Sequence, residues 1–386
     1  MQHFFSEITQ FHTSGQEKNT LEQLCMNCIR SLSLPAESLC FFDIETTGLS
    51  PAVSSLYLLG VLVLENNKLI LHQWFADDYV SEQELLQTFS SFVSNKTTFV
   101  HYNGSTFDLP YLEKKYKAYK LPSPFLGKKQ IDLYKGTKNF SEWFYMKNRK
   151  LTSMETLFGF QRHDQYTGKD CIALYTEFMQ KKFFRDDKKD SLRQKLLLHN
   201  EEDLKGTFLC SQLLLYKNPE ILSADFDIKE QRIILTGEVA GHYPVPLSIQ
   251  RENCLIVLEN SCIKLEISLY NGTLYHFFSD YKNYFYLPEE DTAVHKSVGI
   301  YVEPAFRQKA TASNCYVKKE GDFLPLPFKF DLSSCSQLES LLFRESNRSK
   351  LFFIPVSECE RIFDAMNICD FVMSYAYAAM TAPSPA

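Results

Sequence analysis

The pattern of hydrophobic and polar positions changes near residue 217 of the 386-residue chain. Before this point, apolar runs of strand length alternate with segments whose apolar positions follow the period of a helix. After it, short alternating segments are separated by turns that contain Asn, Gly and Pro, a pattern typical of β-structure. Because a single hydrophobic core rarely grows to this length, we predict two domains. The second, over 219–386, is expected to be a β-rich α+β domain closed by a helix over 357–380.

The first half predicts an α/β domain over 38–218, in which helices flank a mixed sheet. A helical segment over 1–37 is expected to precede it. Capping-box patterns at 81–84 and 152–155 begin two of its helices. Strands are expected at 38–43, 55–64, 68–76 and 97–102, and helices at 81–93, 107–118, 152–159, 171–182 and 191–216.

Composition indicates a globular protein, with 45% hydrophobic and 23% charged residues. No run approaches the roughly 18 apolar residues of a membrane span, and the N-terminus lacks the features of a secretory signal. We therefore expect a cytoplasmic protein without a membrane partner. The eleven cysteines lack the spacing of a disulfide scaffold and are expected to be reduced. The CxxC from Cys25 to Cys28 lies on an apolar helical stripe, which favours core cysteines over a metal or redox site.

The net charge of −6 does not by itself favour a nucleic-acid partner, because affinity for phosphate backbones depends on Lys and Arg. Residues 113–150, however, contain eleven Lys or Arg against three acids. This segment predicts a local basic footprint, although a solvated basic face has the same composition. In the second domain, basic residues are mixed with aromatic ones in a way compatible with stacking on single-stranded bases and with an ordinary β-domain surface. The aromatic residues concerned are Tyr286, Tyr301 and Tyr316.

Two carboxylates end the first buried strand of the α/β domain. Asp43 and Glu45, in FFDIETTGL, are two residues apart and therefore point to one face of the sheet. Apposed carboxylates repel one another unless a cation lies between them, and hard divalent cations prefer such oxygen ligands. Taken alone, the pair is weak evidence, since chance and surface charge also produce D-x-E.

Two further motifs place acids on helices. Asp108, in HYNGSTFDLPYL, falls in the first turn of a helix that follows a strand and a tight turn at Asn103 and Gly104. The helix dipole also favours a carboxylate there. In HNEED, His199 and Asp203 share one helix face by the i,i+4 rule. Considered singly, such a histidine is more often a core residue and such an aspartate a solvated one.

Together the three motifs resemble the DEDD, or DnaQ-like, exonucleases of the ribonuclease-H-like superfamily, most closely their YprB-like branch. The motifs occur in the family's order, and LTSMETLFGFQRHD at 151–164 is also similar to that branch. The resemblance covers about residues 39–216. It implies a ribonuclease-H-like fold and a divalent-metal-dependent 3′→5′ exonuclease that hydrolyses phosphodiester bonds at the 3′ end of single-stranded DNA or RNA.

The resemblance also assigns roles to residues. It implies that His199 is the general base that deprotonates the attacking water. In the family's histidine branch, four residues usually separate His from Asp, whereas three separate His199 from Asp203, the spacing of the tyrosine branch. The implied ligands of two Mg²⁺ or Mn²⁺ ions are Asp43, Glu45, Asp108 and Asp203.

Substrate contacts follow from family position in the same way. The implied partner is nucleic acid, with single-stranded 3′ ends, and the sequence does not identify protein partners. Groups at Thr46, Thr47 and Gly48 are expected near the terminal nucleotide, and Asn103 near its phosphate or sugar.

Other residues in this half have structural interpretations. Asp132 is interpreted as a cap or as a partner of nearby lysines, and Asp164 and Asp170 as loop and cap residues. Gly206 lowers helix stability by about 1 kcal/mol relative to Ala unless close packing requires it.

An alternative comes from a different class of protein, a catalytically silent nucleic-acid-binding module on the same fold. The acidic quartet argues against it, because a pure binder gains nothing from four carboxylates that face a polyanion. Within the enzyme class, a ribonuclease for short RNA and a trimming nuclease for structured RNA both stay open.

Overall fold

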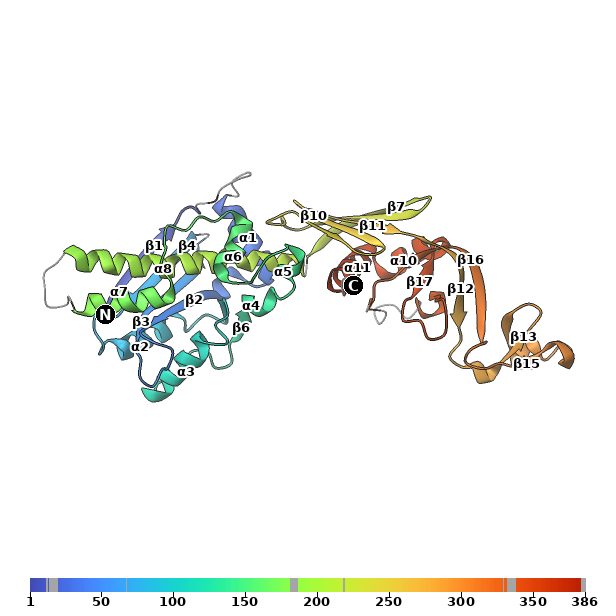
Figure 1. Ribbon diagram of the computed structural model, residues 1–386, viewed down its shortest axis with the longest axis horizontal. Helices are drawn as coiled ribbons and strands as arrows, with labels where there is room; N and C mark the ends of the chain where they lie inside the picture. The colour runs from blue at the N-terminus through green and yellow to red at the C-terminus, as the bar shows by residue number, and fades with distance from the viewer. Residues whose placement is uncertain are drawn as a thin grey trace. The chain divides into compact units, whose positions relative to one another are not determined.

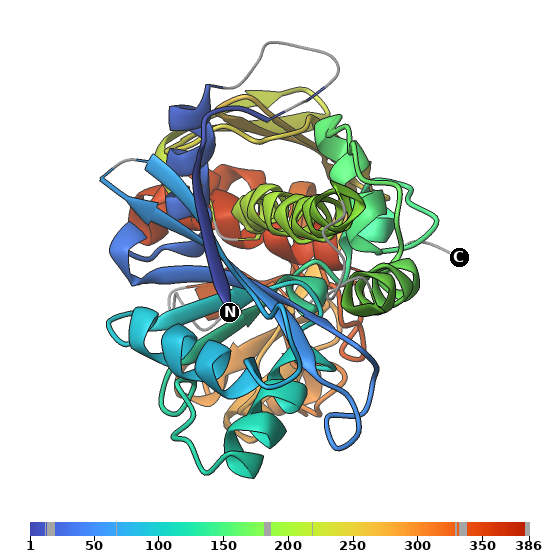
Figure 2. The same cartoon turned by 90° about the vertical axis from the view of Figure 1, so that its left-hand side faces the viewer.

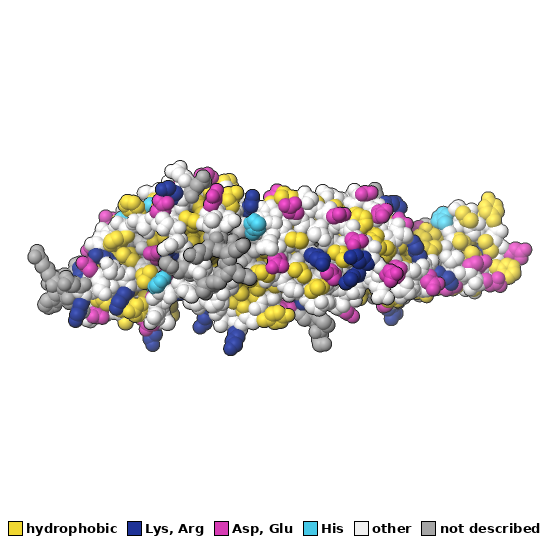
Figure 3. Space-filling model, turned by 90° about the horizontal axis from the view of Figure 1, so that it is seen from above, with side chains coloured by type: hydrophobic (Ala, Val, Ile, Leu, Met, Phe, Trp, Pro, Cys, Tyr) yellow, Lys and Arg dark blue, Asp and Glu magenta, His cyan; other side chains and the backbone are white. Residues whose placement is uncertain are grey.

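The computed structural model describes residues 1–11, 13, 20–66, 68–180, 187–217, 219–328, 330–331 and 338–382. The chain forms two compact units (Figure 1). Unit 1 comprises Met1–Asn218 with Tyr243–Val245, and unit 2 comprises Pro219–His242 with Pro246–Ala386. None of the described helices has the length and apolar character needed to span a membrane. Acidic and basic side chains are interspersed over the face drawn in Figure 3.

A six-stranded mixed sheet forms the centre of unit 1, in the order β1-β4-β3-β2-β5-β6. The neighbouring strands β1, β4, β3 and β2 pair antiparallel. Strands β2, β5 and β6 pair parallel. Strand β3 is buried along all but its last residue, which fits a sheet covered on both faces. The strands are β1 Gln2–Ile8, β2 Leu39–Thr46, β3 Leu56–Glu65, β4 Lys68–Phe75, β5 Thr98–His101 and β6 Lys129–Asp132.

Helices cover the two faces of this sheet (Figure 2). Helices α7 and α8 pack on β2, and α8 also packs on β3, while α2 packs on β3 and β4 from the opposite face. Helix α8 continues into a 3₁₀ segment, Gln212–Tyr216. The helices are α1 Leu21–Leu32, α2 Glu82–Phe92, α3 Asp108–Ala118, α4 Leu133–Gly136, α5 Phe140–Trp143, α6 Leu151–Glu155, α7 Gly168–Gln180 and α8 Asp187–Ser211.

Strand β1 differs from the helical segment that the sequence predicts over 1–37. Helix α1 lies in this segment, but residues 2–8 pair along the outer edge of β4. The ring of His3 stacks on the rings of His72 and Trp74. Pairing with an open strand edge satisfies the backbone groups of β1 and covers that edge of the sheet.

Both predicted capping boxes are wrong in their detail, although the helices form. Ser81 is the N-cap residue of α2, but its side chain makes no capping bond; its backbone and hydroxyl donate to the carboxylate of Asp78. The N-cap residue of α6 is Lys150, two residues before Thr152, and its side chain makes no capping bond either. The side chain of Asn148 accepts from the backbone of Lys150 and from the hydroxyl of Ser153. These bonds hold the turn that leads into each helix.

Aromatic residues dominate the core of unit 1. The rings of Phe42, Phe99 and Phe125 pack with centroids 4.8–5.8 Å apart. Cys25 and Cys28 are buried, and burial raises the pKa of their thiols to about 11 and about 12, which confirms their interpretation as core cysteines.

Unit 2 is β-rich, as predicted. It contains a five-stranded sheet, β7-β8-β11-β10-β9, and two three-stranded sheets, β12-β16-β17 and β14-β13-β15. The strands are β7 Ile221–Lys229, β8 Arg232–Val239, β9 Leu247–Gln250, β10 Cys254–Glu259, β11 Cys262–Ser268, β12 Tyr270–Phe277, β13 Tyr284–Leu287, β14 Thr292–His295, β15 Gln308–Lys309, β16 Tyr316–Pro325 and β17 Phe353–Pro355. A short helix, α9 Lys296–Gly299, follows β14.

The predicted final helix over 357–380 is two helices, α10 Cys359–Met366 and α11 Ile368–Thr381. They are separated by Asn367, whose φ of 63° is incompatible with a continuous α-helix and whose side chain caps α11. Elsewhere in unit 2, the hydroxyls of Tyr286 and Tyr316 both donate to Asp291, while Tyr301 is exposed.

Candidate active site

Carboxylates from three elements meet at the end of β2. Asp43 and Glu45 lie on this strand, and Asp203 lies on α8, which packs across it. One oxygen of each carboxylate lies within 4.8 Å of the others. Asp108, at the first residue of α3, lies outside this group of three but accepts a hydrogen bond from the backbone of Ile44 and repels the other acids. The structure thus brings together the four predicted acids.

Burial disfavours the ionised forms of Asp43, Glu45 and Asp108. Burial and the charges of neighbouring acids raise the pKa of Asp43 well above its usual value. Burial, opposed in part by His199, raises the pKa of Glu45 to about 8. Burial likewise raises the pKa of Asp108 to about 7, against hydrogen bonds from the backbone of Asp108 and Ile44. An all-oxygen donor set that is short of positive charge fits hard divalent cations.

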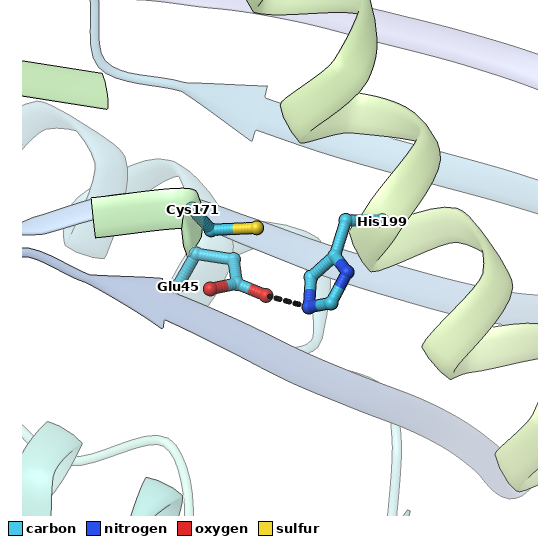
Figure 4. Close-up of side chains that lie close together, drawn as sticks. All are labelled: Glu45, Cys171 and His199. Atoms are coloured by element: carbon cyan, nitrogen blue, oxygen red, sulfur yellow. Dashed lines mark ion pairs between the residues drawn. The ribbon is translucent and has the colours of Figure 1, made fainter. Parts of the chain in front are cut away.

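His199 faces the same carboxylates from α8, one turn before Asp203. Its Nε2 lies 3.5 Å from Oε1 of Glu45 (Figure 4) and 3.8 Å from Oδ2 of Asp203. Its Nδ1 lies 2.5 Å from Oδ2 of Asp164. A proton on Nδ1 that is donated to Asp164 leaves the lone pair of Nε2 directed at the acids. Burial lowers the pKa of His199, but the carboxylates of Glu45, Asp203 and Asp164 raise it by more. The pKa of His199 therefore lies above its ordinary value.

The interpretation of Asp164 as a loop residue is confirmed but incomplete. Asp164 does lie in the loop before α7, but its buried carboxylate orients His199. Glu202 of α8 fixes the loop, because its carboxylate accepts hydrogen bonds from the backbone of His163 and Asp164. Asp170 is confirmed as a cap: at the start of α7 its carboxylate accepts from the backbone N–H of Thr167, and its own backbone N–H donates to the hydroxyl of Thr167.

Arg162 holds the other side of Asp203. Its guanidinium lies 2.5 Å from Oδ1 of Asp203 and makes two bonds of 2.7 Å to the carboxylate of Glu155. Glu155 passes so close to α8 that a Cβ at Gly206 would lie 1.7 Å from its Oε1. Gly206 therefore has the close-packing role that its place in a helix predicts.

Asn200 positions Asp43. Its amide donates to Oδ2 of Asp43 at 2.9 Å, and its own oxygen accepts from the amide of Gln73 at 2.9 Å. Gly60, which is paired with Asp43 across the sheet, makes room for this side chain: a Cβ there would lie 1.9 Å from the oxygen of Asn200.

Of the predicted substrate contacts, Thr46, Thr47 and Gly48 follow Glu45 directly in the chain, and the two threonines bond to the turn after β2. The hydroxyl of Thr46 donates to the carbonyl of Gly48, and that of Thr47 accepts from the backbone of Ser55. Asn103 is exposed, with a φ of 61°. Its backbone N–H donates to Asp132, which also caps α4 as predicted. Contact of these residues with a substrate stays a prediction.

The basic segment 113–150 is partly structural. Lys115 is buried against Glu82, and Arg149 lies over the ring of Tyr134. Its other basic residues include eight exposed lysines, Lys114, Lys117, Lys120, Lys129, Lys135, Lys138, Lys147 and Lys150.

Sequence reasoning missed the residues that orient the acids and His199. The signals were present: Asn200 and Glu202 stand inside HNEED, and Arg162 and Asp164 stand at the end of LTSMETLFGFQRHD. Arg162, Asp164 and Glu202 act through contacts between a loop and a helix some 40 residues apart, and Asn200 acts through a contact with β2, 157 residues away. Periodicity does not show such contacts.

Comparison with known proteins agrees with the fold. Residues 40–214 match the family model of the RNase_H superfamily, and unit 1 is a ribonuclease-H-like domain, as predicted. A search of curated proteins found no match. Similar solved structures include the family B DNA polymerase of the hyperthermophilic archaeon Pyrobaculum calidifontis, at 16% identity and a TM-score of 0.34. That match covers 64% of this chain, which spans only 35% of the polymerase.

Two structures of Escherichia coli exonuclease I are also similar. The zinc-bound complex with single-stranded DNA is 12% identical, with 90% of this chain and 74% of that chain covered and a TM-score of 0.26. The complex with a dA16 oligonucleotide is 13% identical, with 90% and 75% covered and the same TM-score.

Proposed function

We propose that this chain is a divalent-metal-dependent 3′→5′ exonuclease of the DEDD type, with its catalytic domain over 38–218. The observation that supports this most is His199, whose Nδ1 is held by Asp164 while its Nε2 faces the carboxylates of Glu45 and Asp203. A histidine held in this way beside apposed carboxylates is suited to general-base chemistry. A binding module has no use for this arrangement.

The proposed roles follow from the geometry. Two Mg²⁺ or Mn²⁺ ions, held by the four acids Asp43, Glu45, Asp108 and Asp203, would stabilise negative charge on the attacking and leaving oxygens. Nε2 of His199 takes the proton from the attacking water, and Asp164 stabilises the imidazolium that results. Arg162 and Asn200 hold Asp203 and Asp43 in place. The raised pKa of His199 falls back once the charges of the neighbouring acids are neutralised.

The proposed substrate is a single-stranded 3′ end of DNA or RNA. The exposed lysines of 113–150 offer a local positive surface for its backbone, despite the net charge of −6. By family position, Thr46, Thr47 and Gly48 would contact the terminal nucleotide, and Asn103 its phosphate or sugar. The cytoplasm is the proposed location.

The test is nucleotide release from single strands labelled at the 3′ or the 5′ end, as DNA and as RNA, with Mg²⁺, Mn²⁺ or EDTA. We expect metal-dependent loss of mononucleotides from the 3′ end by the wild type and none by Asp43→Asn. Asp190→Asn, an exposed acid on the same helix as Asp203, is the matched control and should cleave like the wild type. Cleavage retained by a folded Asp43→Asn would overturn the proposal. Strand binding without cleavage by the metal-loaded wild type would instead favour the silent binding module.

A further inference from the structure

Cys171 lies next to Glu45 and His199, and the three side chains form a second group of possible metal ligands. Cys171 lies in the first turns of α7 and is fully buried. Its thiol, a carboxylate oxygen of Glu45 and a ring nitrogen of His199 all lie within 4.8 Å of one another. Figure 4 shows the three side chains directed toward a common point, from α7, β2 and α8.

The donor atoms of this group differ from those of the acid cluster. The group of Asp43, Glu45 and Asp203 offers oxygen only, which suits Mg²⁺ and Mn²⁺. The group with Cys171 offers one sulfur, one nitrogen and one oxygen. Such mixed sets with a thiolate select softer ions, Zn²⁺ above all.

The spacing suits a tetrahedral ion. Two nitrogen or oxygen ligands about 2.0 Å from a tetrahedral zinc lie roughly 3.3 Å apart. Nε2 of His199 and Oε1 of Glu45 are 3.5 Å apart, close to this separation. The side chains of His199 and Glu45 are 8% and 10% exposed, whereas Cys171 is fully buried. An ion between them would therefore reach solvent on the side of His199 and Glu45 only.

An outer shell for a metal-bound histidine is also present. Ligand histidines commonly donate their second ring proton to a carboxylate, which fixes the tautomer and the ring orientation. Asp164 accepts this bond from Nδ1 of His199 at 2.5 Å. On the other side, the hydroxyl of Tyr57 lies 3.5 Å from Oε2 of Glu45, which leaves Oε1 for the ion.

We propose that Cys171, His199 and Glu45 form a Zn²⁺ site that excludes the hard-metal site. Zinc takes the lone pair of His199 and an oxygen of Glu45, and the protons held by the Cys171 thiol and by the pair of Glu45 and His199 pass to solvent. Because Glu45 belongs to both groups, the two occupancies compete. Zinc bound here therefore inhibits the enzyme by removing its base, and this regulatory consequence rests on the proposed nuclease function.

The test measures binding on the full chain, independently of cleavage. Co²⁺ serves as a spectroscopic probe for Zn²⁺, since a thiolate ligand produces a charge-transfer absorption. We expect this absorption in the wild type, its removal by added Zn²⁺, and its absence in Cys171→Ser and Cys171→Ala. Cys40→Ser is the matched control, because Cys40 is another fully buried thiol of the same core. It should keep the absorption.

Affinity gives a second readout. Loss of an outer-shell partner weakens metal binding about 10- to 100-fold, so loss of the ligand Cys171 should weaken Zn²⁺ by at least roughly tenfold while Mn²⁺ affinity changes little. In the cleavage assay with Mn²⁺, each protein is compared with itself with and without Zn²⁺, and inhibition should need a higher zinc concentration in both Cys171 variants.

The outcomes separate the two proposals. A wild type without thiolate absorption, or with equal Zn²⁺ affinity in both Cys171 variants, overturns the zinc site even if the chain is a nuclease. Thiolate-bound cobalt in a chain that cleaves no strand when it is freed of cobalt and zinc and loaded with Mn²⁺ supports the zinc site and overturns the nuclease. Circular dichroism shows whether each variant is folded. If neither Cys171 variant folds, the cobalt absorption of the wild type decides the test.

Discussion

The hydrogen bond between Asp164 and His199 defines one tautomer of the base. If Asp164 becomes Asn, its amide can donate to Nδ1, which places the proton on Nε2 and removes the lone pair from the reacting side. We expect Asp164→Asn to lower kcat by about 10²-fold or more, since general-base catalysis contributes that much, while KM for the strand changes little. Steady-state kinetics on a 3′-labelled strand measures both.

The control for this change is Asp170→Asn. Asp170 caps the same region of the chain but does not bond to His199. It should keep kcat within about twofold of the wild type, a change within the range of ordinary surface substitutions. If Asp164→Asn retains the wild-type kcat, or loses it only by raising KM, Asp164 does not position the base.

The raised pKa values of the acids predict how stability depends on pH without metal. In the folded protein, Glu45 titrates at about 8 and Asp108 at about 7, against ordinary values of 4.5 and 3.8. The folded state therefore binds more protons than the unfolded state in this window, and the raised pKa of His199 acts in the same direction. The free energy of unfolding should fall as pH rises from about 4.5 to about 8.

Thermal unfolding in EDTA across this range measures the effect. Asp43→Asn removes one of the repelling charges and should raise the unfolding temperature at pH 8 more than at pH 4.5. Saturating Mn²⁺ should flatten the pH dependence of the wild type, because metal-bound carboxylates stay ionised. If the metal-free wild type gains stability as pH rises from about 4.5 to about 8, the pKa values of Glu45 and Asp108 are not raised in the folded protein.

At the scale of elements, α8 depends on a glycine that disfavours helix. Gly206→Ala adds helix propensity, yet the new Cβ would meet the carboxylate of Glu155 at 1.7 Å. Glu155 must then move, and with it Arg162 and Asp203. We expect a net destabilisation of about 1–3 kcal/mol, the usual cost of overpacking, together with a loss of activity.

Gly168 offers the matched control for Gly206. It begins α7, and a Cβ there would meet nothing within 4 Å. Gly168→Ala should be neutral or slightly stabilising in urea unfolding. Equal stability of the two alanine variants would show that the packing of Glu155 on α8 does not constrain the site.

Elements with strong periodicity were predictable, and their ends and partners were not. The buried runs of β2 and β3 and the apolar stripe of α1 give clear patterns. Strand β1 was missed because its role depends on the free edge of β4, which lies some 60 residues away. The break at Asn367 was missed because one residue with positive φ leaves the hydrophobic period almost unchanged.

In the candidate site, too, some residues could be predicted from the sequence and others could not. The four acids Asp43, Glu45, Asp108 and Asp203 could be found because their motifs resemble those of a known family and occur in that family's order. Cys171 could not, because a buried cysteine on a helix is ordinarily a small core residue. Its meaning depends on which side chains of β2 and α8 it faces, and only the fold supplies that information.

At the scale of the whole molecule, all four acids lie in unit 1, and each unit has its own hydrophobic core. A ligand that binds only the folded form stabilises the unit that binds it, by about 2.7 kcal/mol at a concentration 100 times its Kd. Calorimetry of the full chain should therefore show two transitions, of which Mn²⁺ raises one and leaves the other unchanged. In Asp43→Asn, Mn²⁺ should change the temperature of neither transition. If a single transition responds as a whole, the two units unfold cooperatively, and if neither transition moves in the wild type, the acids do not hold the metal.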